Sequence, residues 1–74
     1  MSGLPRVSGR EAVAALNKAG FLTRRQKGSH IILRRDIPFA QTVVPDHPEL
    51  DRGTLRAIIR QSGLTVEQFV DLLR

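Results

Sequence analysis

The residue of this chain best suited to acid-base chemistry is His30. It follows a glycine and a serine, and two cations, Lys27 and Arg34, lie close to it in the sequence. An imidazole has an unperturbed pKa of about 6.5, so it can accept or donate a proton at neutral pH. Neighbouring cations would hold a phosphate and offset the charge that develops on it, without a metal ion. A surface histidine, or one that only donates a hydrogen bond to a phosphate, also fits this pattern.

Positive charge is concentrated around this histidine. The chain has 12 Lys and Arg against 7 Asp and Glu, which gives a net charge of +5. The stretch 24–35 contains no acid and carries Arg24, Arg25, Lys27, Arg34 and Arg35. Such a cluster favours a polyanionic ligand, and RNA or DNA is the commonest polyanion in cytoplasm. The alternative is a solvated surface whose arginines reflect composition alone.

Two further sets of polar residues have simpler interpretations. His47 lies in an Asp-His-Pro sequence, where a local hydrogen bond within a turn is typical. Arg52, Arg56 and Arg60 recur every fourth residue, which places them along one side of a helix. They form either a phosphate-binding stripe or the solvated face that helices of small domains need, and the solvated face is the simpler interpretation.

Helical patterns flank the basic stretch. A capping box that begins at Ser8, followed by apolar residues at helical spacing, predicts a helix over about 9–19. A second apolar helical pattern ends at Gly63. A capping box that begins at Thr65 then predicts a short last helix.

The intervening residues are typical of strands. Segments 21–26 and 29–35 flank Lys27-Gly28, which is expected to be a hairpin turn, and 36–39 forms a second turn before a strand over 41–45. In the second strand the side chains alternate between two faces, Ser29, Ile31 and Leu33 on one and His30, Ile32 and Arg34 on the other. The facing of the first strand stays open. Short consecutive strands favour an antiparallel meander with helices on one face, an α+β two-layer fold that leaves His30 exposed.

The composition excludes several function classes. Seventy-four residues suffice for one domain, 1–74, with one small core, and leave no room for a nucleotide-binding βαβ pair. The absence of cysteine removes disulfides and thiolate sites, and two histidines cannot complete a typical zinc site, so we expect neither metal nor cofactor. Residues 1–10 contain no apolar signal segment, so we expect a soluble, cytoplasmic protein without a membrane span.

Five blocks of sequence occur together, in order, over about residues 7–73. They are Ser8-Gly9-Arg10-Glu11, Ala19-Gly20-Phe21, Arg25-Gln26-Lys27-Gly28-Ser29-His30, Thr42-Val43-Val44-Pro45 with His47, and Gly53-Thr54-Leu55-Arg56-Ala57-Ile58 before Gly63. In this combination they resemble the HicA-type toxins of prokaryotic type II toxin-antitoxin systems.

This resemblance implies an mRNA interferase, a small endoribonuclease with a double-stranded-RNA-binding-like α-β-β-β-α fold, here followed by a short extra helix. It also implies that a HicB-type antitoxin holds the toxin inactive. His30 matches the family's essential histidine, so the resemblance assigns it the catalytic role of general acid or base. We expect further RNA contacts, from charge, strand facing and the turn beside the histidine, at Arg24, Lys27, Ser29 and Arg34.

The expected partners are therefore mRNA and the antitoxin, with the toxin a monomer alone and part of a higher assembly with its antitoxin. We expect the antitoxin to cover His30. With no aromatic residue on the basic sheet face, weak sequence preference is expected. Two alternatives remain: a non-catalytic RNA-binding module of the same fold, and an interaction protein whose basic face binds an acidic partner.

Overall fold

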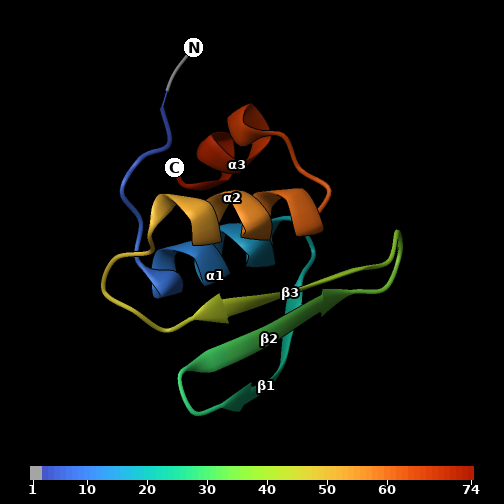
Figure 1. Ribbon diagram of the computed structural model, residues 1–74. Helices are drawn as coiled ribbons and strands as arrows, with labels where there is room; N and C mark the ends of the chain where they lie inside the picture. Colours follow the sequence, from blue (N-terminus) through green and yellow to red (C-terminus); the bar gives the residue numbers. More distant parts are fainter. Residues whose placement is uncertain (1–2) are drawn as a thin grey trace.

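A computed structural model describes residues 3–74 as three helices and a three-stranded sheet. The elements in chain order are α1 (Gly9–Lys18), β1 (Leu22–Lys27), β2 (His30–Arg35), β3 (Ala40–Pro45), α2 (Arg52–Gln61) and α3 (Val66–Leu72). The strands pair antiparallel in the order β1-β2-β3. Helices α1 and α2 lie on one face of the sheet, and α3 packs on their far side (Figure 1). This arrangement confirms the predicted α+β fold with helices on one face.

The first and last helices begin where their capping boxes predict. Ser8 Oγ accepts a hydrogen bond from the Glu11 backbone N–H at 3.0 Å, and Glu11 accepts one from the Ser8 N–H at 2.8 Å. Thr65 and Gln68 repeat both bonds at the start of α3. Because these bonds satisfy N–H groups that have no partner within the helix, they fix its first turn. Within residues 3–74, no helix is long and apolar enough to cross a membrane.

The helices and one sheet face enclose the hydrophobic core. In β2, Ile31 and Leu33 are buried while His30 is exposed, which confirms the predicted alternation. Thr42 of β3 is also buried, and its hydroxyl donates to Gln61 Oε1 at 2.8 Å. The core consists of Val7, Ala12, Ala15, Leu16, Phe21, Ile31, Leu33, Val44, Leu50, Leu55, Ile58, Ile59 and Phe69.

The hairpin between β1 and β2 differs from the prediction by one residue. The turn is Gly28-Ser29, so Ser29 is not on the strand face with Ile31, and β2 begins at His30. Gly28 has φ +59°, a left-handed conformation that glycine adopts without strain at the first position of a two-residue turn. The strand ladder therefore continues through Lys27, which pairs directly with His30.

A bulge in β1 settles which of its residues share a face with His30. The register shifts between Thr23 and Arg25, so Arg24 is the extra, unpaired residue. Beyond the shift, Arg25 pairs with Ile32 across the ladder. Residues that pair directly across a ladder lie on the same face, so Arg25 lies on the face of His30.

Candidate active site on the outer face of the sheet

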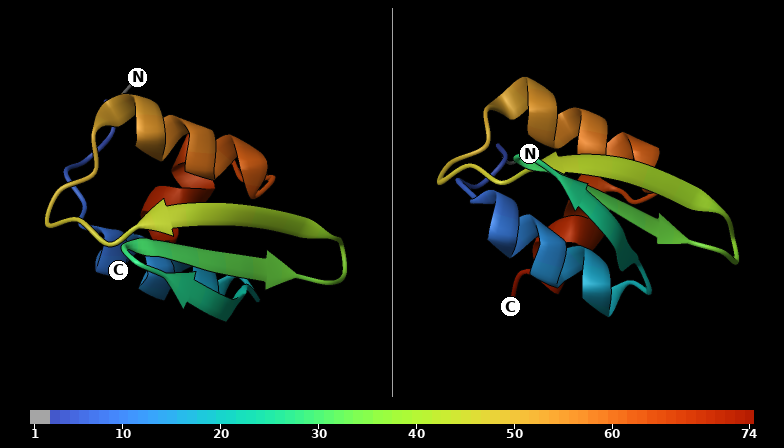
Figure 2. Two further views of the ribbon diagram at one scale, coloured as in Figure 1. Left: turned by 60° about the horizontal axis from the view of Figure 1, so that its bottom comes forward. Right: turned by 90° about the horizontal axis from the view of Figure 1, so that it is seen from below.

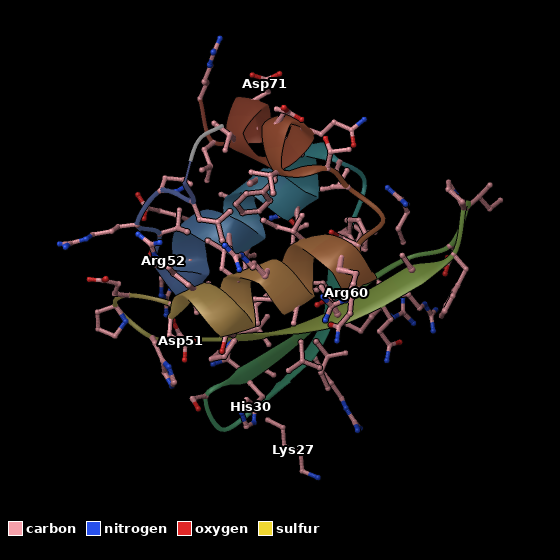
Figure 3. The ribbon with its side chains drawn as sticks, turned by 45° about the horizontal axis from the view of Figure 1, so that its top comes forward. Lys27, His30, Asp51, Arg52, Arg60 and Asp71 are labelled. Atoms are coloured by element: carbon pink, nitrogen blue, oxygen red, sulfur yellow. The ribbon has the colours of Figure 1, made fainter. Side chains whose placement is uncertain are left out.

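The sheet face turned away from the helices, here called the outer face, carries the candidate site. Figure 3 shows Lys27 and His30 together on the side of the sheet opposite α2. By strand register, the outer face is formed by Leu22, Arg25 and Lys27 of β1, His30, Ile32 and Arg34 of β2, and Gln41, Val43 and Pro45 of β3. It is a mixed basic and apolar surface with one imidazole at the end of its central strand.

His30 lies at the start of β2 and is open to solvent. It pairs with Lys27 on one side and with Pro45 on the other. Directly opposed residues of antiparallel strands have Cβ atoms about 4.5–5.5 Å apart, so the Lys27 ammonium can reach a group bound at the imidazole. No ion pair within residues 3–74 engages His30 or Lys27. Both side chains are therefore available to a ligand.

Backbone contacts from distant segments fix the strand end that carries this histidine. The Asp46 N–H donates to the Ser29 carbonyl at 2.6 Å, and the Gly9 N–H donates to the His47 carbonyl at 2.9 Å. Arg10 forms an ion pair with Asp46 at 3.2 Å. The turn before β2, the loop after β3 and the start of α1 are thus held together. The backbone of His47 has a structural role, but through a bond to the distant start of α1 and not through the local turn bond expected from the sequence.

Gly9 is a residue that sequence reasoning used only as part of a family block. A Cβ atom at this position would lie 2.0 Å from the Pro45 carbonyl oxygen, far inside van der Waals contact. Only glycine lets the start of α1 approach the end of β3 so closely. Since Pro45 pairs with His30, this close approach supports the strand end at the candidate site.

The predicted RNA contacts lie in three different environments. Lys27 lies on the outer face beside His30. Ser29 is exposed in the turn, and its carbonyl is already bonded to the loop after β3. Arg24 is exposed at the bulge. The structure brings only Lys27 into direct register with the histidine.

The fourth predicted contact, Arg34, lies at the other end of the outer face. Its Nε lies 2.9 Å from Asp36 Oδ1, so its charge is partly neutralised. Arg25, which pairs with Ile32, lies nearer to His30 and was not among the predicted contacts. The ladder is regular from Lys27 to Arg25, so the pairing with β2 puts Arg25 on this face, and the bulge alters the facing only of the residues before it.

Arg35 belongs to the basic stretch, but its charge is used within the fold. Its guanidinium lies 4.6 Å from the centroid of the Phe21 ring. It donates to the carbonyls of Pro38, Ala19 and Ser62 at 3.0, 3.3 and 3.4 Å. Arg35 therefore joins the turn after β2 to the ends of α1 and α2, and its role is structural.

The start of α2 contains a carboxylate with a perturbed pKa. Asp51 accepts a hydrogen bond from the Thr54 N–H at 2.7 Å, and this bond lowers the pKa of Asp51 below its ordinary value, with a smaller contribution from the charge of His47. Arg52 and Arg60 lie along α2, away from the outer face (Figure 3), and are exposed. Within residues 3–74, no group of three or more His, Cys, Asp or Glu side chains could hold a metal ion.

The family to which the chain belongs is shown by its sequence. Residues 9–64 match the family described as "HicA toxin of bacterial toxin-antitoxin". The matched range includes α1, all three strands of the sheet and α2. No curated protein matches the chain. The chain belongs to the HicA toxin family, and it is the toxin of a toxin-antitoxin system, as the five sequence blocks implied.

Proposed function

With membership of the HicA toxin family as the premise, we propose that the protein is an endoribonuclease that cleaves mRNA on the outer face, with His30 as general acid or base. The observation that carries this proposal is the exposed imidazole of His30 in direct register with Lys27. An acid-base group can move the proton of a ribose 2′-hydroxyl, and a cation beside it can stabilise the charge that develops on the phosphate.

The proposed reaction is an internal transesterification. His30 removes the proton from a ribose 2′-hydroxyl, and the 2′-oxygen attacks the adjacent phosphorus. The bond from phosphorus to the 5′-oxygen breaks, this oxygen takes up a proton from water, and His30 returns its proton to the solvent. The products are a 2′,3′-cyclic phosphate and a 5′-hydroxyl end. General acid-base catalysis by one side chain accelerates a reaction by about 10²–10⁴, so slow turnover is expected.

The cations of the outer face hold the phosphate in this proposal. Lys27 lies opposite His30, and Arg25 follows across the strand from Ile32. Their charges offset the negative charge that develops on the phosphorane oxygens. Arg34 contributes less because it already pairs with Asp36.

Identification of the RNA product ends tests the reaction. Purified toxin is incubated with a defined RNA, and the ends are compared with those from an RNA that carries a single 2′-deoxy nucleotide at the cut site. We expect 2′,3′-cyclic phosphate ends from the first RNA and no cleavage of the second at that site. Cleavage of the deoxy-substituted bond would contradict the mechanism, and intact RNA throughout would contradict the activity.

The first alternative is a non-catalytic RNA-binding module in which His30 only contacts a phosphate. The His30→Ala variant separates the two functions. A nuclease loses cleavage and growth arrest and still binds RNA, whereas a binding module loses only a small part of its affinity.

The second alternative is an interaction protein whose basic face binds an acidic partner. Each phosphate contact displaced from single-stranded RNA contributes a slope of about −0.7 to log K against log salt. RNA affinity that is absent or insensitive to salt would favour this alternative.

We further propose that a HicB-type antitoxin inhibits the toxin by covering His30. The imidazole is exposed at the end of the central strand, so a single protein surface that covers this end can exclude RNA from it. Protection of His30 from a histidine-modifying reagent in the complex is the expected result. A complex that suppresses cleavage while His30 stays reactive would contradict this proposal.

A further inference from the structure

The hairpin between β2 and β3 projects beyond the helices (Figure 2). Its turn carries two large apolar side chains that the core does not use, Ile37 at 89% exposure and Phe39 at 68%. Isolated exposed apolar residues are common, but an aromatic ring at a projecting tip is a typical contact for a ligand. The turn itself was predicted over 36–39, and the exposure of its ring was not.

Phe39 is positioned at the end of the sheet opposite His30. It precedes Ala40, which pairs with Arg35 on the core side of the sheet. Phe39 itself lies in the turn, directly before β3 begins, so its exposed ring stands at the end of the sheet that an RNA strand running along β2 from His30 would reach. From the core side, Arg35 holds the backbone of the turn through the Pro38 carbonyl at 3.0 Å. The turn that carries the ring is thus anchored.

Apolar and basic side chains occupy the outer face between His30 and Phe39. Ile32 of β2 pairs with Val43 of β3, which is 42% exposed. Arg25 lies on the other side of Ile32. An RNA duplex presents phosphates and sugars and hides the faces of its bases, so apolar side chains gain nothing from it. A single strand presents both phosphates and base faces, and this mixed surface suits it better.

We propose, on the basis of the function above, that single-stranded RNA lies along β2, with the cleaved bond at His30 and an unpaired base stacked on Phe39. The five steps from His30 to Arg35 span about 17 Å at the usual rise of a strand. A few nucleotides of extended RNA cover this distance. Aromatic stacking accepts every base, so Phe39 selects for an unpaired base and adds little preference among sequences.

Substrates of different length test this assignment. Short RNAs that fill only the His30 end are compared with RNAs extended on the 5′ side or on the 3′ side, and each extension is also tested after annealing to a complementary strand. Phe39→Ala is expected to weaken binding of one extended single strand by about 5- to 150-fold, the range for loss of one stacked base. Short and annealed RNAs are expected to bind both proteins equally, and Phe39→Trp is expected to restore binding.

Ile37→Ala is the matched control, because Ile37 lies on the same turn and is more exposed than Phe39 but has no ring. It is expected to change RNA binding by less than Phe39→Ala does. An effect of Phe39→Ala that is absent, or equal for short and extended RNA, overturns the proposal. Weakened inhibition by the antitoxin with unchanged RNA binding overturns it too, and would assign the tip to a protein partner.

Binding is measured directly by fluorescence anisotropy as well as through KM. If extended RNA loses affinity for Phe39→Ala but the wild-type protein cuts no RNA, the path of the RNA is supported and the nuclease proposal fails. If the wild-type protein cuts RNA, but Phe39→Ala has the same effect on short and on extended RNA, only the assignment of Phe39 fails.

Discussion

The two ends of β2 use positively charged side chains in opposite ways. At one end, His30 is exposed beside Lys27, and neither takes part in an ion pair within the described residues. At the other end, Arg35 donates to three backbone carbonyls and stacks on Phe21. One end offers its charge to a ligand, and the other uses its charge to hold the fold.

The helix directions explain this difference. Helices α1 and α2 both end near Arg35, which binds the carbonyls of Ala19 and Ser62. The last carbonyls of a helix lack partners within it and carry partial negative charge, so they attract a cation. Both helices begin at the other end, where Ser8 and Asp51 bind the free N–H groups. Lys27, on the outer face at that end, has no helix carbonyl and no ion-pair partner within residues 3–74.

The adjacent arginines of β2 give the sharpest test of this contrast, since Arg34 and Arg35 lie on opposite faces. Arg35→Met removes charge-assisted hydrogen bonds and a cation–π contact, and we expect it to lower the free energy of unfolding by about 2 kcal/mol. Cleavage per folded molecule is expected to stay unchanged at saturating RNA, where binding at the turn held by Arg35 does not limit the rate. Urea unfolding and single-turnover cleavage of the same samples provide both values.

Arg34→Met is the matched control for stability. Its exposed ion pair with Asp36 is expected to contribute less than about 1 kcal/mol. If Arg34→Met lowers the free energy of unfolding as much as Arg35→Met does, the claim that only Arg35 holds the fold is contradicted.

Glycine substitutions test how the site end is held. Gly9→Ala places a methyl group against the Pro45 backbone, so we expect a loss of about 1–3 kcal/mol in the free energy of unfolding. In α2, a Cβ atom added at Gly53 would lie 3.8 Å from Asp51 Oδ1, an ordinary van der Waals contact. Gly53→Ala is therefore expected to stabilise by about 0.5–1 kcal/mol. Equal effects in thermal unfolding would show that the close approach of α1 to β3 is not required.

The salt dependence of RNA binding tests whether Arg34 and Arg35 also differ in their contact with the ligand. Arg34→Met removes one cation from the outer face, and the slope of log K against log salt is expected to change by about 0.7 if this cation contacts a phosphate. Arg35→Met is expected to leave the slope unchanged. A larger change for Arg35→Met than for Arg34→Met would contradict the assignment of faces.

The smallest expected effect concerns Asp51 at the start of α2. Its pKa is lowered from 3.8 in the folded protein, so it contributes stability above its unfolded pKa and loses this contribution as the pH falls through the lowered value. Asp51→Asn keeps a good N-cap without the titrating group. The difference in urea midpoint between wild type and variant is expected to be constant at neutral pH and to change below about pH 4. A difference that is independent of pH would contradict the role of the charge.

The sequence predicts the elements that depend on local signals. Capping boxes at Ser8 and Thr65 locate two helices, and the alternation in β2 separates Ile31 from His30. The hairpin turn is Gly28-Ser29, one residue later than the predicted Lys27-Gly28, because Lys27 still pairs with His30 in the ladder. The only local turn signal is Gly28, and it is compatible with both positions of the turn.

The parts that the sequence does not predict depend on distant partners. The bulge at Arg24 arises from pairing with β2, and only that pairing brings Arg25 onto the outer face. Arg35 finds carbonyls at Ala19 and Ser62, which are remote from it in the sequence. A count of charges therefore identifies a basic segment but does not separate cations that bind a ligand from cations that hold the fold.

The central claim is that His30 moves a proton on bound RNA and does little for binding or stability. Single-turnover cleavage, RNA affinity and urea unfolding of His30→Ala, measured on one preparation, test it directly. We predict a fall in the cleavage rate of at least ~100-fold, with the affinity nearly unchanged and the unfolding midpoint equal to that of the wild type. Cleavage at the wild-type rate, or a loss of rate that only follows a loss of affinity, would contradict the claim.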